Sequence, residues 1–150
     1  MKKNILDTES ANAICQRVLR LTPGSKPIWG NMTATEMLAH CNSCNIQVLR
    51  EGNSGRITST KQYLLRILAL YIAPNFKKNL STEKRHDMKG KIDESLFGLE
   101  LQRFSDTIRQ FPMNSKRLTL HHPAFGNIST NQWGIAVYKH MDHHLRQFGV

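Results

Sequence analysis

Two histidines near the C-terminus have the spacing of metal ligands. They are His140 and His144, within the stretch Tyr138-Lys-His-Met-Asp-His-His-Leu-Arg-Gln147. Four residues is just over one turn of an α-helix, so both imidazoles leave the same helical face. Two nitrogen donors on one face form half of a metal site.

Apolar residues on the same stripe indicate that these imidazoles face the protein interior. Trp133, Ala136 and Val137 precede His140 at helical spacing. A buried imidazole needs partners for both ring nitrogens, and a single buried histidine usually finds a carbonyl or a carboxylate. Two on adjacent turns are harder to satisfy in that way, whereas a metal ion satisfies both directly. Spacing alone leaves structural histidines and metal ligands as open alternatives.

A third candidate ligand, His40, lies a hundred residues earlier in another helical stretch. A lone histidine on a helix is more often structural or exposed than a ligand. Glu36 and Cys44 lie one turn to either side of it, and either could be an added ligand or an outer partner of a ligand. If the two helices meet, three histidines form a site with room for water or substrate.

Two residues are candidates for a general base, namely Glu36 and His143. His143 lies about 60° from His140 on an ideal helical wheel, and it is alternatively an outer partner of the metal or a solvent-exposed residue. Gln147 lies one turn beyond His144 and could orient a ligand or substrate.

The cysteine pattern argues against a disulfide framework. The chain has three cysteines, Cys15, Cys41 and Cys44, which is an odd number. Cys41-Asn-Ser-Cys44 is a CxxC without a second copy, which excludes a zinc site made of four cysteines. We expect both of these cysteines to fill the core.

The elements that must position these residues are predicted to be helical throughout. Periodic apolar residues and capping boxes predict an all-α fold, a four-helix bundle with an extra short helix. Leu118 to Leu120 could be briefly extended. The helices are expected near residues 11–19, from Thr33 to about Gly52, at 60–72 (short and apolar), from Glu94 to Phe111 with Pro112 ending it, and from Ser129 onward.

Length and composition predict one domain over residues 1–150 and a cytoplasmic location. The N-terminus lacks the apolar core of a secretory signal, and the apolar run from Tyr63 to Ile72 is too short to span a bilayer. We expect that run to pack in the core, with a partner surface as the alternative. The formal net charge is +10, but the basic segment Lys77 to Lys91 lacks interleaved aromatic residues and is expected to be a solvated loop. We therefore expect neither a nucleic acid nor a membrane as partner.

Two sequence blocks resemble the DinB/YfiT-like superfamily of metalloenzymes. The first is Trp29-Gly-x-Met-Thr-x-x-Glu-Met-Leu-x-His40. The second runs from His122-Pro-x-Phe-Gly through Gln-Trp-Gly and Tyr-Lys-His-x-Asp-His-His to Gly149. More narrowly, the chain is similar to a branch of small bacterial proteins grouped as a domain of unknown function. The resemblance covers nearly the whole chain, although residues 53–91 contribute little.

The resemblance implies a four-helix bundle that holds a divalent metal with three histidines, which here fall on His40, His140 and His144. It also implies that some relatives use a low-molecular-weight thiol as co-substrate, that some hydrolyse or isomerise, and that relatives are often dimers.

The leading hypothesis is a metal-dependent transferase or hydrolase acting on a small molecule. Zinc, nickel and iron all accept imidazole ligands, so the identity of the metal is open. A zinc ion would lower the pKa of a bound water from its value in bulk water towards about 7. The alternatives are a bundle protein that binds metal or acts in a stress response without turnover, and a basic protein that binds nucleic acid. A homodimer and a monomer are both compatible with the sequence.

Overall fold

In the computed structural model, which describes residues 2–150, the chain is mostly helical and contains five α-helices. A two-stranded antiparallel ribbon, β1 (His121–His122) with β2 (Gly126–Asn127), precedes the last helix. The α-helices are α1 (Thr8–Val18), α2 (Ala34–Arg50), α3 (Thr60–Ile67), α4 (Phe97–Met113) and α5 (Thr130–Gln147). Shorter helical pieces are a π-helix at Leu68–Ile72 and 3-10 turns at Lys84–His86 and Glu94–Leu96.

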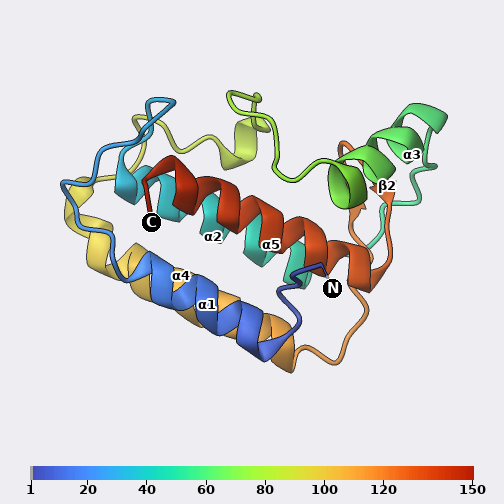
Figure 1. The fold of residues 1–150 in the computed structure, drawn as a ribbon, viewed down its shortest axis with the longest axis horizontal. Helices are drawn as coiled ribbons and strands as arrows, with labels where there is room; N and C mark the ends of the chain where they lie inside the picture. Colours follow the sequence, from blue (N-terminus) through green and yellow to red (C-terminus); the bar gives the residue numbers. More distant parts are fainter. Residues whose placement is uncertain (1) are drawn as a thin grey trace.

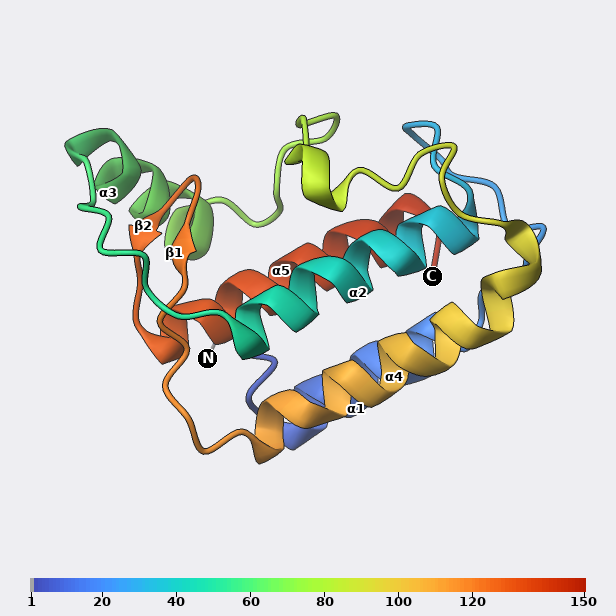
Figure 2. The ribbon, with the colours of Figure 1, turned by 180° about the vertical axis from the view of Figure 1, so that it is seen from behind.

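The four longer helices lie in two layers. Helices α2 and α5 run side by side in one layer and α1 and α4 in the other, as both views show (Figures 1 and 2). The layers meet through contacts of α2 with α4 and of α1 with α5. Helix α3 and the ribbon lie together at one end of the molecule (Figure 2). The segment between the π-helix and α4 runs along the outer side of the α2 and α5 layer, away from α1 and α4 (Figure 2).

Capping boxes start both helices that carry the candidate ligands, as the sequence predicted. In α2 the Thr33 hydroxyl accepts from the Glu36 N–H, and the Glu36 carboxylate accepts from the Thr33 N–H. Ser129 and Gln132 make the same reciprocal pair at the start of α5. Each box satisfies two backbone donors that have no partner within the helix. These contacts fix where the two helices begin and therefore the register of their histidines.

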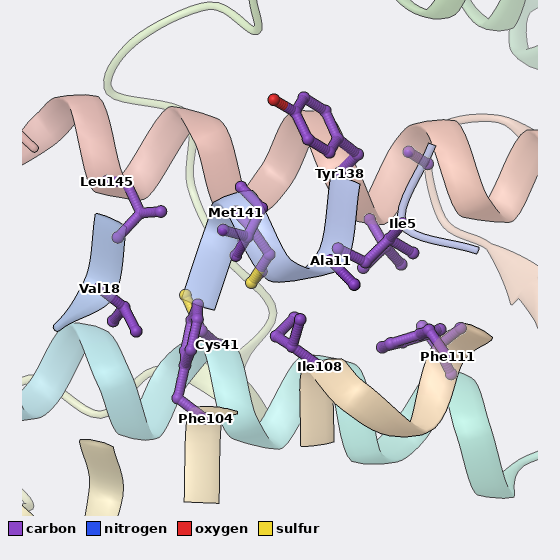
Figure 3. Close-up of a cluster of buried hydrophobic side chains, with 14 of the residues drawn as sticks. Ile5, Ala11, Val18, Cys41, Phe104, Ile108, Phe111, Tyr138, Met141 and Leu145 are labelled. Atoms are coloured by element: carbon purple, nitrogen blue, oxygen red, sulfur yellow. The ribbon is translucent and has the colours of Figure 1, made fainter. Parts of the chain in front are cut away.

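The core fills the space between the two layers. Phe104, Ile108 and Phe111 of α4 meet Met141 of α5 and Cys41 of α2 there (Figure 3), and all five side chains are fully buried. Truncating one buried aromatic ring of this kind typically costs about 3–5 kcal/mol. This packing holds α2 and α5 next to each other from the inner side.

Several local predictions were wrong in detail. The expectation that the Tyr63 to Ile72 run packs in the core is wrong, because Tyr63, Leu64 and Ile72 are 51%, 62% and 68% exposed and, of this run, only Leu70 is buried. The residues of Leu118 to Leu120 form no strand, and the extended pairing begins at His121 instead. The prediction that the helix ends at Pro112 is confirmed to within one residue, because α4 ends at Met113.

The α3 helix owes its place to polar contacts rather than to burial. Gln62 donates to the Pro123 carbonyl, and Arg66 donates to the Asn127 carbonyl. No helix within residues 2–150 combines the length and the apolar character needed to cross a bilayer.

Candidate metal centre

Three histidines from two helices meet between α2 and α5. His40 Nε2 lies 3.2 Å from His140 Nε2, and His140 Nε2 lies 3.1 Å from His144 Nε2. The centroids of the three rings are 4.7 to 5.2 Å apart, so no ring stands away from the other two. The structure therefore brings together the three residues that the sequence singled out as candidate ligands.

The tautomer of His144 is fixed by Gln147. The Gln147 side-chain amide donates to the Trp29 carbonyl at 2.7 Å, so its other end, Oε1, faces His144 Nδ1 at 2.8 Å. An amide oxygen only accepts, and therefore Nδ1 carries the proton. The second nitrogen of His144, Nε2, is left with a free lone pair that points at His140.

A glycine lets the Trp29 loop come close enough to hold Gln147. Gly30 has a φ of +76°, and a Cβ atom on it would lie 2.7 Å from Gln147 Nε2. A side chain at this position would displace the amide and would also strain the backbone. The Trp29-Gly30 pair therefore serves to position Gln147.

The tautomer of His40 is fixed by a backbone carbonyl. His40 Nδ1 lies 2.8 Å from the carbonyl oxygen of His86, which can only accept, so Nδ1 is protonated and Nε2 carries the lone pair. The imidazole of His86 is itself held on α2. Its Nε2–H donates to the Gln47 side-chain oxygen, and its Nδ1 accepts from the Ser43 hydroxyl, both at 2.8 Å.

Hydrogen bonds satisfy the nitrogens that meet at the centre only weakly, because the one polar partner of His40 Nε2 besides His140 among the described residues is the Cys44 thiol, at 3.9 Å. Two lone pairs, from His40 and His144, point at His140 Nε2. If that nitrogen carries a proton, it can donate fully to only one of them; if it carries none, three lone pairs face one another. A cation between them would accept all three.

The distances fit coordination of one cation. With metal–nitrogen bonds of about 2.0–2.1 Å, two ligand nitrogens are about 2.9 Å apart at a right angle and about 3.3 Å apart at the tetrahedral angle. The two separations of 3.2 and 3.1 Å lie within this range. The donor set and its spacing therefore suit a divalent ion that binds imidazole.

Burial keeps the three imidazoles uncharged. It is the main cause that lowers the pKa of His144 to about 3, and it also lowers the pKa of His40. The pKa of His140 is well below its usual value, again chiefly through burial and then through the neighbouring imidazoles. Neutral imidazole is the form that binds a metal, so protonation of the ligands does not compete with metal binding at physiological pH.

Cys44 adds a sulfur donor to the same place. Its Sγ lies 3.9 Å from His40 Nε2, and donor atoms of His40, Cys44 and His140 all lie within 4.8 Å of one another. This cluster could hold a metal ion. The expectation that Cys44 fills the core is wrong, because it is half-buried beside His40; Cys41 does fill the core.

The two candidate bases have different surroundings. Both oxygens of Glu36 are engaged: one accepts from Thr33 N–H at 2.8 Å and the other from Gly90 N–H at 2.6 Å. His143 packs edge-on against Trp29 and His144, and its buried Nδ1 has no hydrogen-bond partner. Burial, followed by the charge of Arg146, lowers the pKa of His143, which leaves the imidazole a neutral acceptor.

Sequence reasoning missed the part played by the basic segment. The sequence predicts a solvated loop for residues 77–91, yet His86 in that segment orients His40, and Gly90 N–H donates to the Glu36 carboxylate. The only signal within the segment was one histidine among lysines and arginines. Its contribution to the site is a backbone carbonyl, which no side-chain pattern reveals.

Two surface cavities lie elsewhere in the molecule. One of about 210 Å³ is lined by residues of α2 together with Arg85 and His86. A second of about 180 Å³ is lined by Lys2, Tyr138 and Lys139 among others. Neither is lined by the three histidines that meet between α2 and α5.

The sequence matches the family described as "Protein of unknown function (DUF1569)" over residues 1–149. No curated protein and no solved structure matches the chain.

Proposed function

We propose that this chain, which belongs to the DUF1569 family, is a divalent-metal-dependent enzyme that acts on a small molecule as a transferase or hydrolase. In this proposal His40, His140 and His144 are the ligands. The observation that carries it is the pair of fixed tautomers, because Gln147 and the His86 carbonyl each turn a bare Nε2 towards His140. A divalent cation would accept all of these lone pairs at once, whereas hydrogen bonds pair them only with the help of the weakly donating Cys44 thiol.

A divalent cation held by three neutral imidazoles would act as a Lewis acid on a water or thiol that reaches it. The chain's own residues would orient and deprotonate the reactant. His143 is the better candidate for the general base, since its Nδ1 has no partner while both Glu36 oxygens are engaged with backbone donors. Glu36 stays in the proposal as the weaker candidate.

Zinc, nickel and iron remain the candidate metals, and a low-molecular-weight thiol is the proposed co-substrate of a transferase. These proposals rest on the ligand chemistry and on the resemblance to DinB/YfiT-like proteins. Membership in that superfamily, with α1, α2, α4 and α5 as its four-helix bundle, is proposed for the same reason. The packing of these helices in two layers is compatible with it. A cytoplasmic location and a homodimer also stay proposals.

One observation favours the alternative, a metal-binding or stress-response protein without turnover. A protein without turnover needs no substrate cavity at its metal, and neither of the two surface cavities described above is lined by the three histidines. His140 is nevertheless half-buried rather than buried by its exposed surface.

The first test is the metal content of protein purified without a histidine tag. We expect about one equivalent of a transition metal in the wild type and loss of it in His140→Ala. His121→Ala is the matched control, because His121 is bonded to Asn127 in the ribbon and should leave the metal in place. Metal-free wild type that takes up no zinc, nickel or iron on addition would overturn the proposal.

A further inference from the structure

Helices α2 and α5 present the same pattern of donors to each other. In α5 the pair is His140 and His144, and in α2 it is His40 and Cys44, in each case four residues apart. A spacing of four puts both members of a pair on one helical face. Two facing helices therefore offer four donors, whereas the proposed function uses three of them.

The sulfur lies close to the donor atoms of two of the three histidines, His40 and His140. With a metal–sulfur bond of about 2.3 Å and a metal–nitrogen bond of about 2.05 Å, a tetrahedral site separates the two donor atoms by about 3.6 Å. Cys44 Sγ is 3.9 Å from His40 Nε2, a difference that a small side-chain rotation removes. Cys44 has no other polar partner among the hydrogen bonds of the described residues than His40.

We propose that Cys44 closes the metal centre as a fourth, displaceable ligand, so that the resting site has three nitrogens and one sulfur. The inference rests on the proposed function and assigns a regulation to that site. On binding, the thiol proton leaves to solvent as the metal–sulfur bond forms. A substrate must then displace the sulfur from the metal, and the released thiolate takes up a proton from solvent.

The surroundings of Cys44 suit a donor that can be displaced. It is only half-buried, and its neighbours Glu83 and Arg85 belong to the segment that covers the outer side of α2. Structural zinc sites have four protein ligands, while catalytic sites keep one position open for water or substrate. A displaceable fourth ligand would hold the metal in the resting state and still admit a substrate thiol, which would replace one sulfur donor with another of the same kind.

The same helix supplies a matched control. Cys41 lies three residues before Cys44 but points into the core (Figure 3), where it is fully buried and contacts Met37. Cys15 is also buried, beside the Ser105 carbonyl. These two thiols cannot reach the histidines without unfolding of the core, so any metal–sulfur signal at this site belongs to Cys44.

The test is the absorption spectrum of the protein loaded with one equivalent of Co²⁺. We expect an intense near-ultraviolet thiolate-to-cobalt band in the wild type and in Cys41→Ala. Cys44→Ala should bind one cobalt and lack the band. A cobalt-loaded wild type without the band, or a Cys44→Ala variant that keeps it, would overturn the fourth-ligand proposal while leaving the three-histidine site standing. A wild type that binds no cobalt would remove both.

A titration with azide tests displacement without a reaction being known. In Cys44→Ala the fourth position is open, so azide should bind the cobalt form at a concentration at least ~10-fold lower than in the wild type, where it must compete with a tethered sulfur. Equal azide affinity in the two proteins would show that Cys44 does not close the site.

Discussion

Replacing Gln147 with leucine removes the group that fixes the tautomer of His144 while keeping a side chain of similar size. The amide makes two contacts, at 2.8 Å to His144 Nδ1 and at 2.7 Å to the Trp29 carbonyl, and it is 4% exposed. In Gln147→Leu the Nδ1 proton loses its acceptor, so the ring can rotate or take the other tautomer. The Nε2 lone pair is then no longer held towards His140.

The expected loss of metal affinity is 10- to 100-fold, the usual effect of removing a hydrogen-bond partner of a ligating histidine, or about 1.4–2.7 kcal/mol. The metal-free protein also loses stability. Two hydrogen bonds disappear and leave partners unpaired, each at about 1–3 kcal/mol, so the free energy of unfolding should fall by about 2–6 kcal/mol. The two effects are separable because the second needs no metal.

Affinity is measured by competing a chromophoric chelator for zinc, and stability by urea unfolding of metal-free protein. Gln132→Leu is the control, because the Gln132 amide also makes two side-chain hydrogen bonds, to Ser129 N–H and to the Tyr71 hydroxyl, but does not touch the histidines. Gly30→Ala displaces the same amide from the other side and should lower affinity in the same direction. If Gln147→Leu loses stability and binds zinc as tightly as the wild type, Gln147 is a structural residue and the tautomer argument fails.

Four further outcomes are expected. Burial and the neighbouring His121 lower the pKa of His122 in the folded protein to about 3. Between the unfolded-state pKa of 6.5 and this value only the unfolded chain binds the proton, so the free energy of unfolding decreases as the pH is lowered. Between pH 7 and pH 5 this amounts to about 2 kcal/mol, and in urea unfolding His122→Phe should show a pH dependence smaller by that amount. Phe104→Ala should lower the free energy of unfolding by about 3–5 kcal/mol in the same assay, because the ring is fully buried. Ser129→Ala should lower the free energy of unfolding by about 1 kcal/mol through loss of the α5 cap. Leu64→Ser on the exposed face of α3 should change it by less than about 0.5 kcal/mol. A large loss in Leu64→Ser would mean that the Leu64 side chain packs against the four longer helices.

The elements of the fold that local patterns encode could be predicted. The apolar spacing of Phe104, Ile108 and Phe111 identified α4, and the capping boxes at Thr33 and Ser129 located the starts of α2 and α5. Each of these signals depends on residues within one or two turns of one another. The convergence of His40 with the C-terminal pair depends instead on how two helices pack, and the resemblance to a family suggested it where spacing alone did not.

The rest could not be predicted because it depends on tertiary contacts with the backbone. The His86 carbonyl that orients His40 belongs to a segment without periodicity, and a peptide carbonyl has no sequence signature. The apolar run that includes Tyr63 and Leu64 was expected inside, but the core is already closed by the four longer helices, and α3 is held by Gln62 and Arg66 instead. Hydropathy alone does not tell a core helix from an exposed one.

Coordination by three histidines is tested most directly by an anomalous difference map, recorded at the absorption edge of zinc, from crystals of protein grown with zinc. We expect one peak between α2 and α5, about 2.0–2.1 Å from the Nε2 atoms of His40, His140 and His144. A fully loaded crystal with the peak elsewhere, or with any of the three imidazoles turned away from it, would contradict the three-histidine metal centre.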